Sequence, residues 1–213
     1  MALIQKSLQK RYIFVEEDLL CFTAVVANST ILLNKWAYAP ANNFETSTDW
    51  SNWTDYTPWT TITLSNIWDK LYMRNKSETP SNIKTANPNW YWYYFTIQWW
   101  VNASWDLSYM LCKNWTTELF DYCYSWIFAS HSWLLTPPKL KATTLKQYCY
   151  YNMFASSWIK LSETQTGRYT EPFRIPYEWT GTTANSALDN MFAYTWWTFT
   201  WTPEINKTYY LYV

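Results

Sequence analysis

The chain of 213 residues contains 18 tryptophans and 2 glycines, whereas average usage of roughly 7% would give about 15 glycines. Sixteen basic residues balance sixteen acidic ones. Scarce glycine excludes glycine-built phosphate loops of the Rossmann and P-loop kinds. Charge neutrality removes the usual basis for binding nucleic acid over the whole domain, and the aromatic content excludes a disordered chain.

The N-terminal segment has a basic side. Leu3–Phe14 predicts a short helix with apolar residues on one side, and with Lys6, Lys10 and Arg11 on other faces. These three cations are the candidate contacts to a nucleic acid, and a solvated helix face is the alternative. The carboxylates at Glu16–Asp18 stand where the apolar part of a signal peptide would begin, so we predict neither a signal peptide nor a membrane span.

From Phe22 onward the pattern predicts short β-strands separated by turns that contain Pro and Asn. The alternation of apolar and polar residues has a period of two, as in WWTFTW near the C-terminus. The expected strands are Ile31–Leu33, Trp59–Leu64, Trp90–Val101, Trp158–Leu161, Trp196–Trp201 and Thr208–Val213, and short helices are expected at Ser65–Met73 and Thr116–Tyr122.

These elements predict an all-β fold, an antiparallel β-sandwich or jelly roll with a few short helices in loops. We expect one domain over residues 19–213, preceded by a short segment over residues 1–18. Because two-residue hairpins rely on glycine, tight hairpins should be few and crossover connections common. The sequence Asn-Met-Phe-Ala occurs at Asn152–Ala155 and again at Asn190–Ala193, but its flanks do not continue the match, so no repeat is predicted.

No arrangement of residues indicates an enzyme. His131 is the single histidine and has no nearby carboxylate to orient it, so a catalytic triad is not predicted. The four cysteines lack the CxxC spacing of a zinc site. We expect them to be buried thiols, with two disulfides in an oxidising compartment as the alternative. The four cysteines are Cys21, Cys112, Cys123 and Cys149. Cofactors, metals and small-molecule substrates are likewise not expected.

The tryptophans are the main functional signal. One core cannot readily hide so many rings, and Trp and Tyr anchor protein interfaces. We therefore expect burial against partner chains in a large homo-oligomer, with core filling as one alternative. A second alternative is a carbohydrate-binding module that stacks Trp on sugar rings. The candidate interface residues are Trp50, Trp53, Trp59, Trp99, Trp100 and Trp179.

Three segments in the second half resemble the capsid proteins of circovirus-like DNA viruses in order and rough spacing. They are His131–Pro138 (HSWLLTPP), Ser157–Leu161 (SWIKL) and Ile205–Val213 (INKTYYLYV). The resemblance implies a single jelly roll that assembles with copies of itself into the shell of a virion. Such capsids usually begin with an Arg-rich arm that binds the genome, and this chain has only the three basic residues named above.

The middle of the chain resembles cytochrome c oxidase subunit II. That family has two membrane spans and a dinuclear copper site on a cupredoxin barrel. Here both corresponding spans are polar and the two-Cys ligand loop has no counterpart, so this resemblance implies a copper-less, non-catalytic subunit of a larger mitochondrial complex. The matching segments are Val15–Leu20, Leu71–Met73, Pro80–Ser81, Ile83–Lys84, Trp90–Trp92 and Ser108–Leu111. Between these alternatives, we expect the self-associating shell subunit.

Overall fold

The computed structural model describes residues 19–36, 42–83, 93–114, 116–130, 132–195, 198 and 200–213. The expected helix Leu3–Phe14, its basic residues Lys6, Lys10 and Arg11, and His131 lie outside these ranges. Within the described ranges nearly all regular structure is β, and the one helical element is a short 3-10 helix, η2 (Leu107–Met110). This confirms the all-β fold class.

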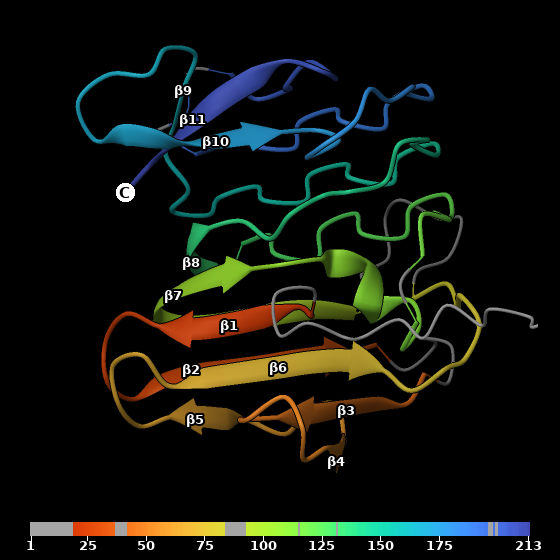
Figure 1. Cartoon of the computed structure of the whole chain (residues 1–213), viewed down its shortest axis with the longest axis vertical. Helices are drawn as coiled ribbons and strands as arrows, with labels where there is room; N and C mark the ends of the chain where they lie inside the picture. Colours follow the sequence, from red (N-terminus) through yellow and green to blue (C-terminus); the bar gives the residue numbers. More distant parts are fainter. Residues whose placement is uncertain are drawn as a thin grey trace, which may run out of the picture.

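The larger sheet is curled, and its strands follow the order β4-β3-β6-β1-β7-β2-β5 with antiparallel pairing (Figure 1). Strand β8 adds to β7 in parallel. The strands are β1 (Cys21–Ala24), β2 (Ser29–Lys35), β3 (Phe44–Ser47), β4 (Thr54–Tyr56), β5 (Ile62–Leu64), β6 (Lys70–Asn75), β7 (Tyr93–Ser104) and β8 (Ser132–Thr136).

Among the described strands, β3 and β4 form a hairpin between chain neighbours, with a loop over residues 48–53, whereas most other neighbours in the sheet are distant in sequence. The expectation of few tight hairpins and many crossovers is therefore confirmed. Left-handed backbone, the conformation that favours glycine, is adopted instead by residues such as Asn28, Trp59 and Trp68, with φ of 62°, 75° and 74°.

Strand β7 carries an interruption that shapes the surface. Its side chains alternate between buried and less buried from Tyr93 to Ile97, and alternation resumes at Val101. Between these points Gln98, Trp99 and Trp100 are all exposed, and Trp99 has a φ of 65°. The parallel register with β8 shifts at the same place. Such a bulge re-aims side chains, so both indoles point outward where a regular strand would have turned one inward.

Above β8 the chain runs back and forth in three stacked segments, residues 122–130, 148–156 and 186–194, which we call the coil stack (Figure 1). Their N–H groups divide into two alternating sets. Those of Cys123, Ser125, Ile127 and Ala129 donate to carbonyls three residues earlier in the chain. Those of the even-numbered residues from 122 to 130 donate to carbonyls of residues 147–155, at 2.8–3.0 Å.

The coil stack is a sequence repeat, so the prediction of no repeat is wrong. Its segments read YCYSWIFAS, YCYYNMFAS and SALDNMFAY. Every fourth residue is left-handed, at 122, 126 and 130 in the first segment and at the matching places in the others. The period of four matches neither the period of a strand nor that of an α-helix. Only four residues of the third segment, Asn190–Ala193, match the second.

A column of phenylalanines joins the sheet to the coil stack. Phe95 of β7 stacks on Phe128, Phe128 on Phe154, and Phe154 on Phe192, with ring centroids 5.1, 5.6 and 5.4 Å apart and interplanar angles of 10°, 12° and 19°. Phe128, Phe154 and Phe192 occupy the matching position of the three coil segments. Because parallel in-register neighbours lie about one strand spacing apart, identical aromatic side chains fall into contact.

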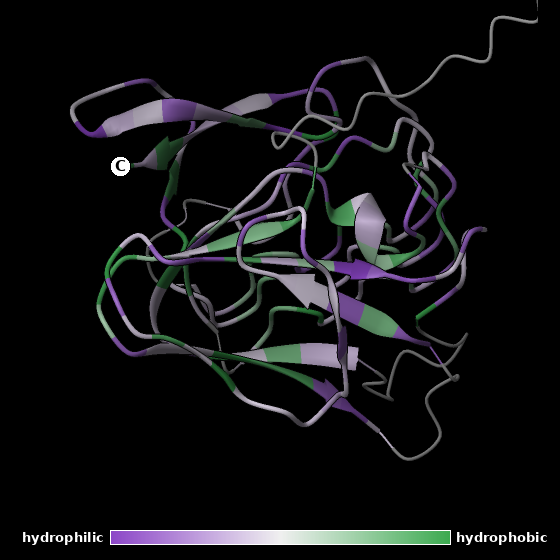
Figure 2. Ribbon diagram, turned by 60° about the horizontal axis from the view of Figure 1, so that its bottom comes forward, coloured by the Kyte–Doolittle hydropathy of each residue, from purple (hydrophilic) through white to green (hydrophobic). Residues whose placement is uncertain are grey.

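A second, small sheet closes the other end, in the order β10-β11-β9. Its strands are β9 (Leu161–Ser162), β10 (Tyr169–Arg174) and β11 (Thr208–Tyr212). One hydrophobic cluster runs continuously from β1 to β11 through the coil stack. Figure 2 shows apolar and polar residues interleaved along the strands, as expected when one side of each strand faces a shared core.

Several expected elements are correct and others are not. Ile31–Leu33 lies in β2, the described part of Trp90–Val101 lies in β7, and Thr208–Val213 contains β11. The helix expected at Ser65–Met73 is wrong, because this segment is a turn that leads into β6, and the helix at Thr116–Tyr122 is wrong, because the segment is loop and turn. The other three strand predictions fail in part. In Trp158–Leu161, only Leu161 is in a strand, and in Trp59–Leu64 only Ile62–Leu64 are. In Trp196–Trp201, the described Thr198 forms an isolated bridge. Trp196, Trp197 and Phe199 lie outside the described residues.

Candidate interaction surface

Four exposed tryptophans from three parts of the chain meet at one place on the surface. Trp99 and Trp100 come from the β7 bulge, Trp133 from β8, and Trp158 from the segment that follows the second coil. Their side chains are 56%, 41%, 37% and 38% exposed, respectively. We call these residues the tryptophan cluster. Since contiguous exposed apolar surface on a folded protein marks a site of interaction, the cluster is the leading candidate.

The rings of the cluster pack on one another. Trp133 lies in the middle, 5.4 Å from Trp158, 5.9 Å from Trp99 and 6.4 Å from Trp100, measured between ring centroids. Trp133 and Trp158 are nearly parallel, with an interplanar angle of 26°, whereas the other two pairs are tilted. Rings that already pack on one another have less side-chain freedom to lose when a partner binds, which lowers the entropic cost of association.

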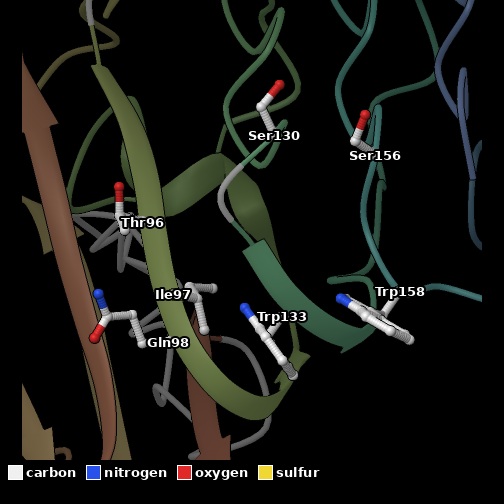
Figure 3. Close-up of a pocket in the computed structure, with 7 residues that line it drawn as sticks. All are labelled: Thr96, Ile97, Gln98, Ser130, Trp133, Ser156 and Trp158. Carbon is white, nitrogen blue, oxygen red and sulfur yellow. The ribbon is translucent and has the colours of Figure 1, made fainter.

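A cavity of about 210 Å³ lies beside the cluster and is lined by Thr96, Ile97, Gln98, Ser130 and Ser156 together with Trp133 and Trp158. Figure 3 shows the indole nitrogens of the two tryptophans turned to the same side, toward Ser130 and Ser156. Those serines hold matching positions in the first and second coils, both with left-handed backbone.

The lining contains no charged residue. It therefore lacks the cations that would hold a phosphate and the carboxylates that would hold a metal ion. Since Trp133 has neighbouring indoles at 5.4–6.4 Å in different directions, stacking of a sugar ring on its faces is disfavoured. What the surface offers is apolar ring edges bordered by neutral donors, which suits the apolar surface of a protein partner.

Of the six tryptophans expected at interfaces, the structure exposes five. Trp99 and Trp100 belong to the cluster, while Trp50, Trp59 and Trp179 lie on other segments and are 41%, 60% and 50% exposed. The structure therefore brings two of the six into one surface with Trp133 and Trp158. Whether any of them contacts a partner stays a prediction.

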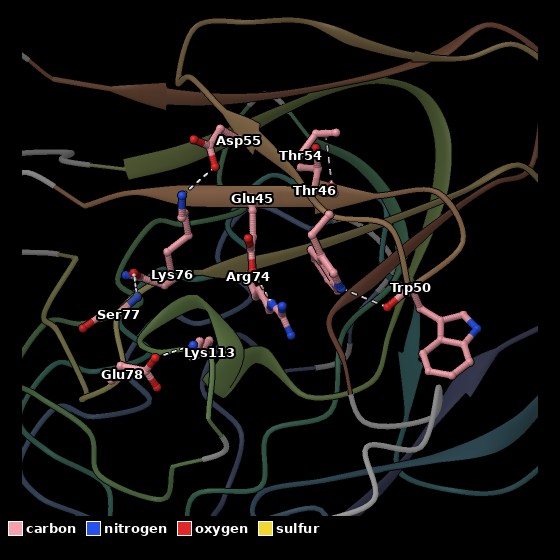
Figure 4. Close-up of polar contacts among 12 residues, drawn as sticks. Glu45, Thr46, Trp50, Thr54, Asp55, Arg74, Lys76, Ser77, Glu78 and Lys113 are labelled. Atoms are coloured by element: carbon pink, nitrogen blue, oxygen red, sulfur yellow. Dashed lines mark hydrogen bonds and ion pairs between the residues drawn. The ribbon is translucent and has the colours of Figure 1, made fainter.

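Trp53, the sixth, is half-buried and packs beside a small buried cluster. The Arg74 guanidinium lies over its ring at 3.9 Å from the centroid and pairs with Glu45 at 2.6 Å. The Trp53 indole N–H donates to the Trp50 carbonyl at 2.9 Å. Figure 4 shows Trp50, Arg74 and Glu45 at this corner. Trp53 is thus part of the internal packing of this corner, because its ring already has a cation and a backbone acceptor.

Sequence reasoning missed Trp133 and Trp158 as surface residues. A signal was present, since each tryptophan follows a coil that ends in Phe-Ala-Ser, at Phe128–Ser130 and Phe154–Ser156. Recognising the repeat would have shown that the two indoles follow adjacent, stacked segments and therefore lie close together. The exposure of Trp99 and Trp100, by contrast, depends on the bulge in β7.

All four cysteines are free and buried, which confirms the expectation of buried thiols. Burial raises the pKa of the Cys149 thiol from its ordinary value of 9.0 to about 12, and also raises the pKa values of Cys21 and Cys112. Tyr124, next to this region, has a pKa well above 10.0 for the same reason. Because the thiolate is the reactive form, the raised pKa values make the thiols of Cys21, Cys112 and Cys149 poor nucleophiles.

In the part of the chain that the structure describes, no group of three or more His, Cys, Asp and Glu side chains is placed to hold a metal ion. This part of the chain also forms no helix with the length and hydropathy that crossing a membrane requires.

Comparison with known proteins identifies no matching family model, no similar curated protein and no similar solved structure.

Proposed function

We propose that this protein is a structural subunit that associates with copies of itself through the tryptophan cluster. The observation that carries the proposal is that Trp99, Trp100, Trp133 and Trp158 form one exposed, pre-packed apolar surface. Tryptophan is the residue most enriched among those that dominate interface energy, and such residues lie together at interface centres.

The edges of the two sheets favour side-chain contact over strand addition. Strands β4 and β5, which end the larger sheet, have three residues each, and β10, at an edge of the small sheet, contains Pro172. Short edge strands and proline both discourage pairing with another chain. Growth of an assembly would therefore use side-chain faces such as the tryptophan cluster.

A closed shell is the form of assembly that the likeness to circovirus-like capsids implies, and virion localisation belongs to the same proposal. Two features of the chain support an assembly role over the alternatives. The rings around Trp133 at the centre of the cluster disfavour sugar stacking there. The described cysteines are buried thiols and not exposed copper ligands.

The test is the oligomeric state of the purified full-length chain, measured by size-exclusion chromatography with light scattering and imaged by negative-stain microscopy. We expect particles much larger than a monomer. The double variant Trp133→Thr/Trp158→Thr should shift the population toward monomer, because each such anchor contributes at least about 2 kcal/mol.

Trp68→Asn is the matched control. Trp68 is 72% exposed, lies in the turn before β6, and has left-handed backbone that Asn tolerates. We expect this variant to assemble like the wild type. A wild-type monomer at micromolar concentration would overturn self-association. A small closed oligomer with no particles would overturn the shell while keeping the association.

A further inference from the structure

A second cavity, of about 320 Å³, lies at the junction between the two sheets, away from the tryptophan cluster. The ends of β7 and β8 form one wall, and strands β10 and β11 form the other. Its lining includes Leu140, Phe173 and Leu211, which are buried, together with three prolines. A site of this volume with an apolar lining fits a small organic molecule.

One amino group projects into this apolar surrounding. The Nζ of Lys139 lies 4.8 Å from the ring centroid of Trp105 and 4.3 Å from that of Tyr177, so it is held between two aromatic rings. The backbone N–H of Lys139 donates to the Trp105 carbonyl at 2.7 Å, which fixes the base of the side chain. Within the described part of the chain, no carboxylate forms an ion pair with Lys139.

Two other charged residues line the cavity. Arg174 uses Nε and Nη1 to donate to the carbonyls of Asn206, Pro176 and Trp179, at 3.2, 2.8 and 2.5 Å. These bonds fix the loop that carries Tyr177 and bring a second positive charge to the wall. Glu171 is exposed and supplies one negative charge. The three charges sum to one positive charge.

We infer that this cavity binds a small monocarboxylate with an aromatic or alkyl body. The apolar lining takes the body of the ligand, and the Lys139 ammonium pairs with its carboxylate between Trp105 and Tyr177. Aromatic walls exclude water, so this ion pair is stronger than one at an open surface. Glu171 opposes phosphates and dicarboxylates, which would bring a second negative charge.

This inference departs from the expectation, drawn from sequence, that no small molecule binds. It does not depend on self-association, because the cavity and the tryptophan cluster share no residue.

The test uses the full-length chain and two probes of nearly equal shape, 3-phenylpropionate and its neutral amide 3-phenylpropionamide. Binding is measured by isothermal titration calorimetry and by saturation-transfer NMR. We expect the acid to bind about tenfold or more tightly than the amide, as a hydrogen bond between charged groups would give. Equal binding of acid and amide, or no binding of the acid, would overturn the inference.

Three variants assign the effect to the site. Lys139→Met keeps an unbranched apolar side chain and should abolish the preference for the acid. Lys146→Met, at an exposed position outside the cavity, should leave the preference unchanged. Tyr177→Phe retains the ring over Nζ and should also bind like the wild type. If the Lys139→Met variant has the same melting temperature as the wild type and still prefers the acid, the proposed pairing of Lys139 with the carboxylate is wrong.

Discussion

The larger sheet and the coil stack pair their buried backbone N–H and C=O groups in different ways. In the sheet, antiparallel strands pair across long sequence separations, and side chains alternate between core and surface. In the coil stack, a left-handed residue recurs every fourth position, and N–H groups alternate between their own segment and the next one. Both satisfy the backbone hydrogen bonds that burial demands.

The difference concerns where left-handed backbone is needed. The sheet requires it mainly at turns and at the β7 bulge, whereas the coil stack requires it within every segment. In a chain with two glycines, residues such as Trp126, Asn152 and Tyr194 take that conformation. Each non-glycine residue there costs roughly 1–2 kcal/mol. The coil stack therefore depends on its aromatic stacking for stability more than the sheet does.

The largest expected effect tests that dependence. Phe154→Ala removes a ring stacked on both sides, by Phe128 and Phe192, and should lower the free energy of unfolding by about 3–5 kcal/mol. Phe44→Ala is the counterpart in the sheet, since Phe44 is also buried and, among the described residues, its ring packs edge-on against that of Tyr93 with no parallel stacking. We expect a smaller loss there. If urea denaturation gives equal losses of unfolding free energy for the two variants, ring stacking does not stabilise the coil stack more than edge-on packing stabilises the sheet.

The buried thiol of Cys149 provides the second test, in the coil stack. Well below pH 9 the thiol is neutral in both the folded and the unfolded chain. Between pH 9 and about 12 it ionises only in the unfolded chain, because burial has raised its pKa in the folded state to about 12. Stability should therefore fall as the pH rises through this window, by up to about 1.4 kcal/mol per unit.

The control for this pH dependence is Cys149→Ala, which keeps the tyrosines and lysines that ionise in the same range. Its stability should fall less steeply than that of the wild type when urea midpoints are compared between pH 9 and 12. Parallel curves for the two proteins would show that the Cys149 thiol is accessible in the folded state.

The smallest expected effect concerns the left-handed positions themselves. Ser156 is exposed and has a φ of 60°, so Ser156→Gly should relieve strain and raise the free energy of unfolding by about 1 kcal/mol. Thr63→Gly, at an exposed position of β5, should instead lower it by about 0.5–1 kcal/mol. Urea midpoints measure both effects. If the free energy of unfolding falls in both variants, the backbone of the coil stack is not strained at Ser156.

Much of the fold could be predicted from local pattern. The β-rich composition around Ile31–Leu33 and Thr208–Val213 marks strands correctly, because β-branched and aromatic residues suit a pleated surface. The coil stack could not be predicted from the periods of two or 3.6 that such reasoning seeks. Ser65–Met73 shows the opposite error, in which a segment that looks helical is drawn into β6 by its pairing with β1 and β3.

The candidate sites show the same division. The sequence by itself determined the β class, a surplus of rings too large for one core, and thiols suited to burial, since these follow from residue types and their spacing. Only the tertiary structure decided which rings meet. The β7 bulge turned Trp99 and Trp100 outward beside Trp133, and the junction of two sheets placed Lys139 between Trp105 and Tyr177. Such contacts join residues distant in sequence, and register and packing, which no local pattern encodes, set them.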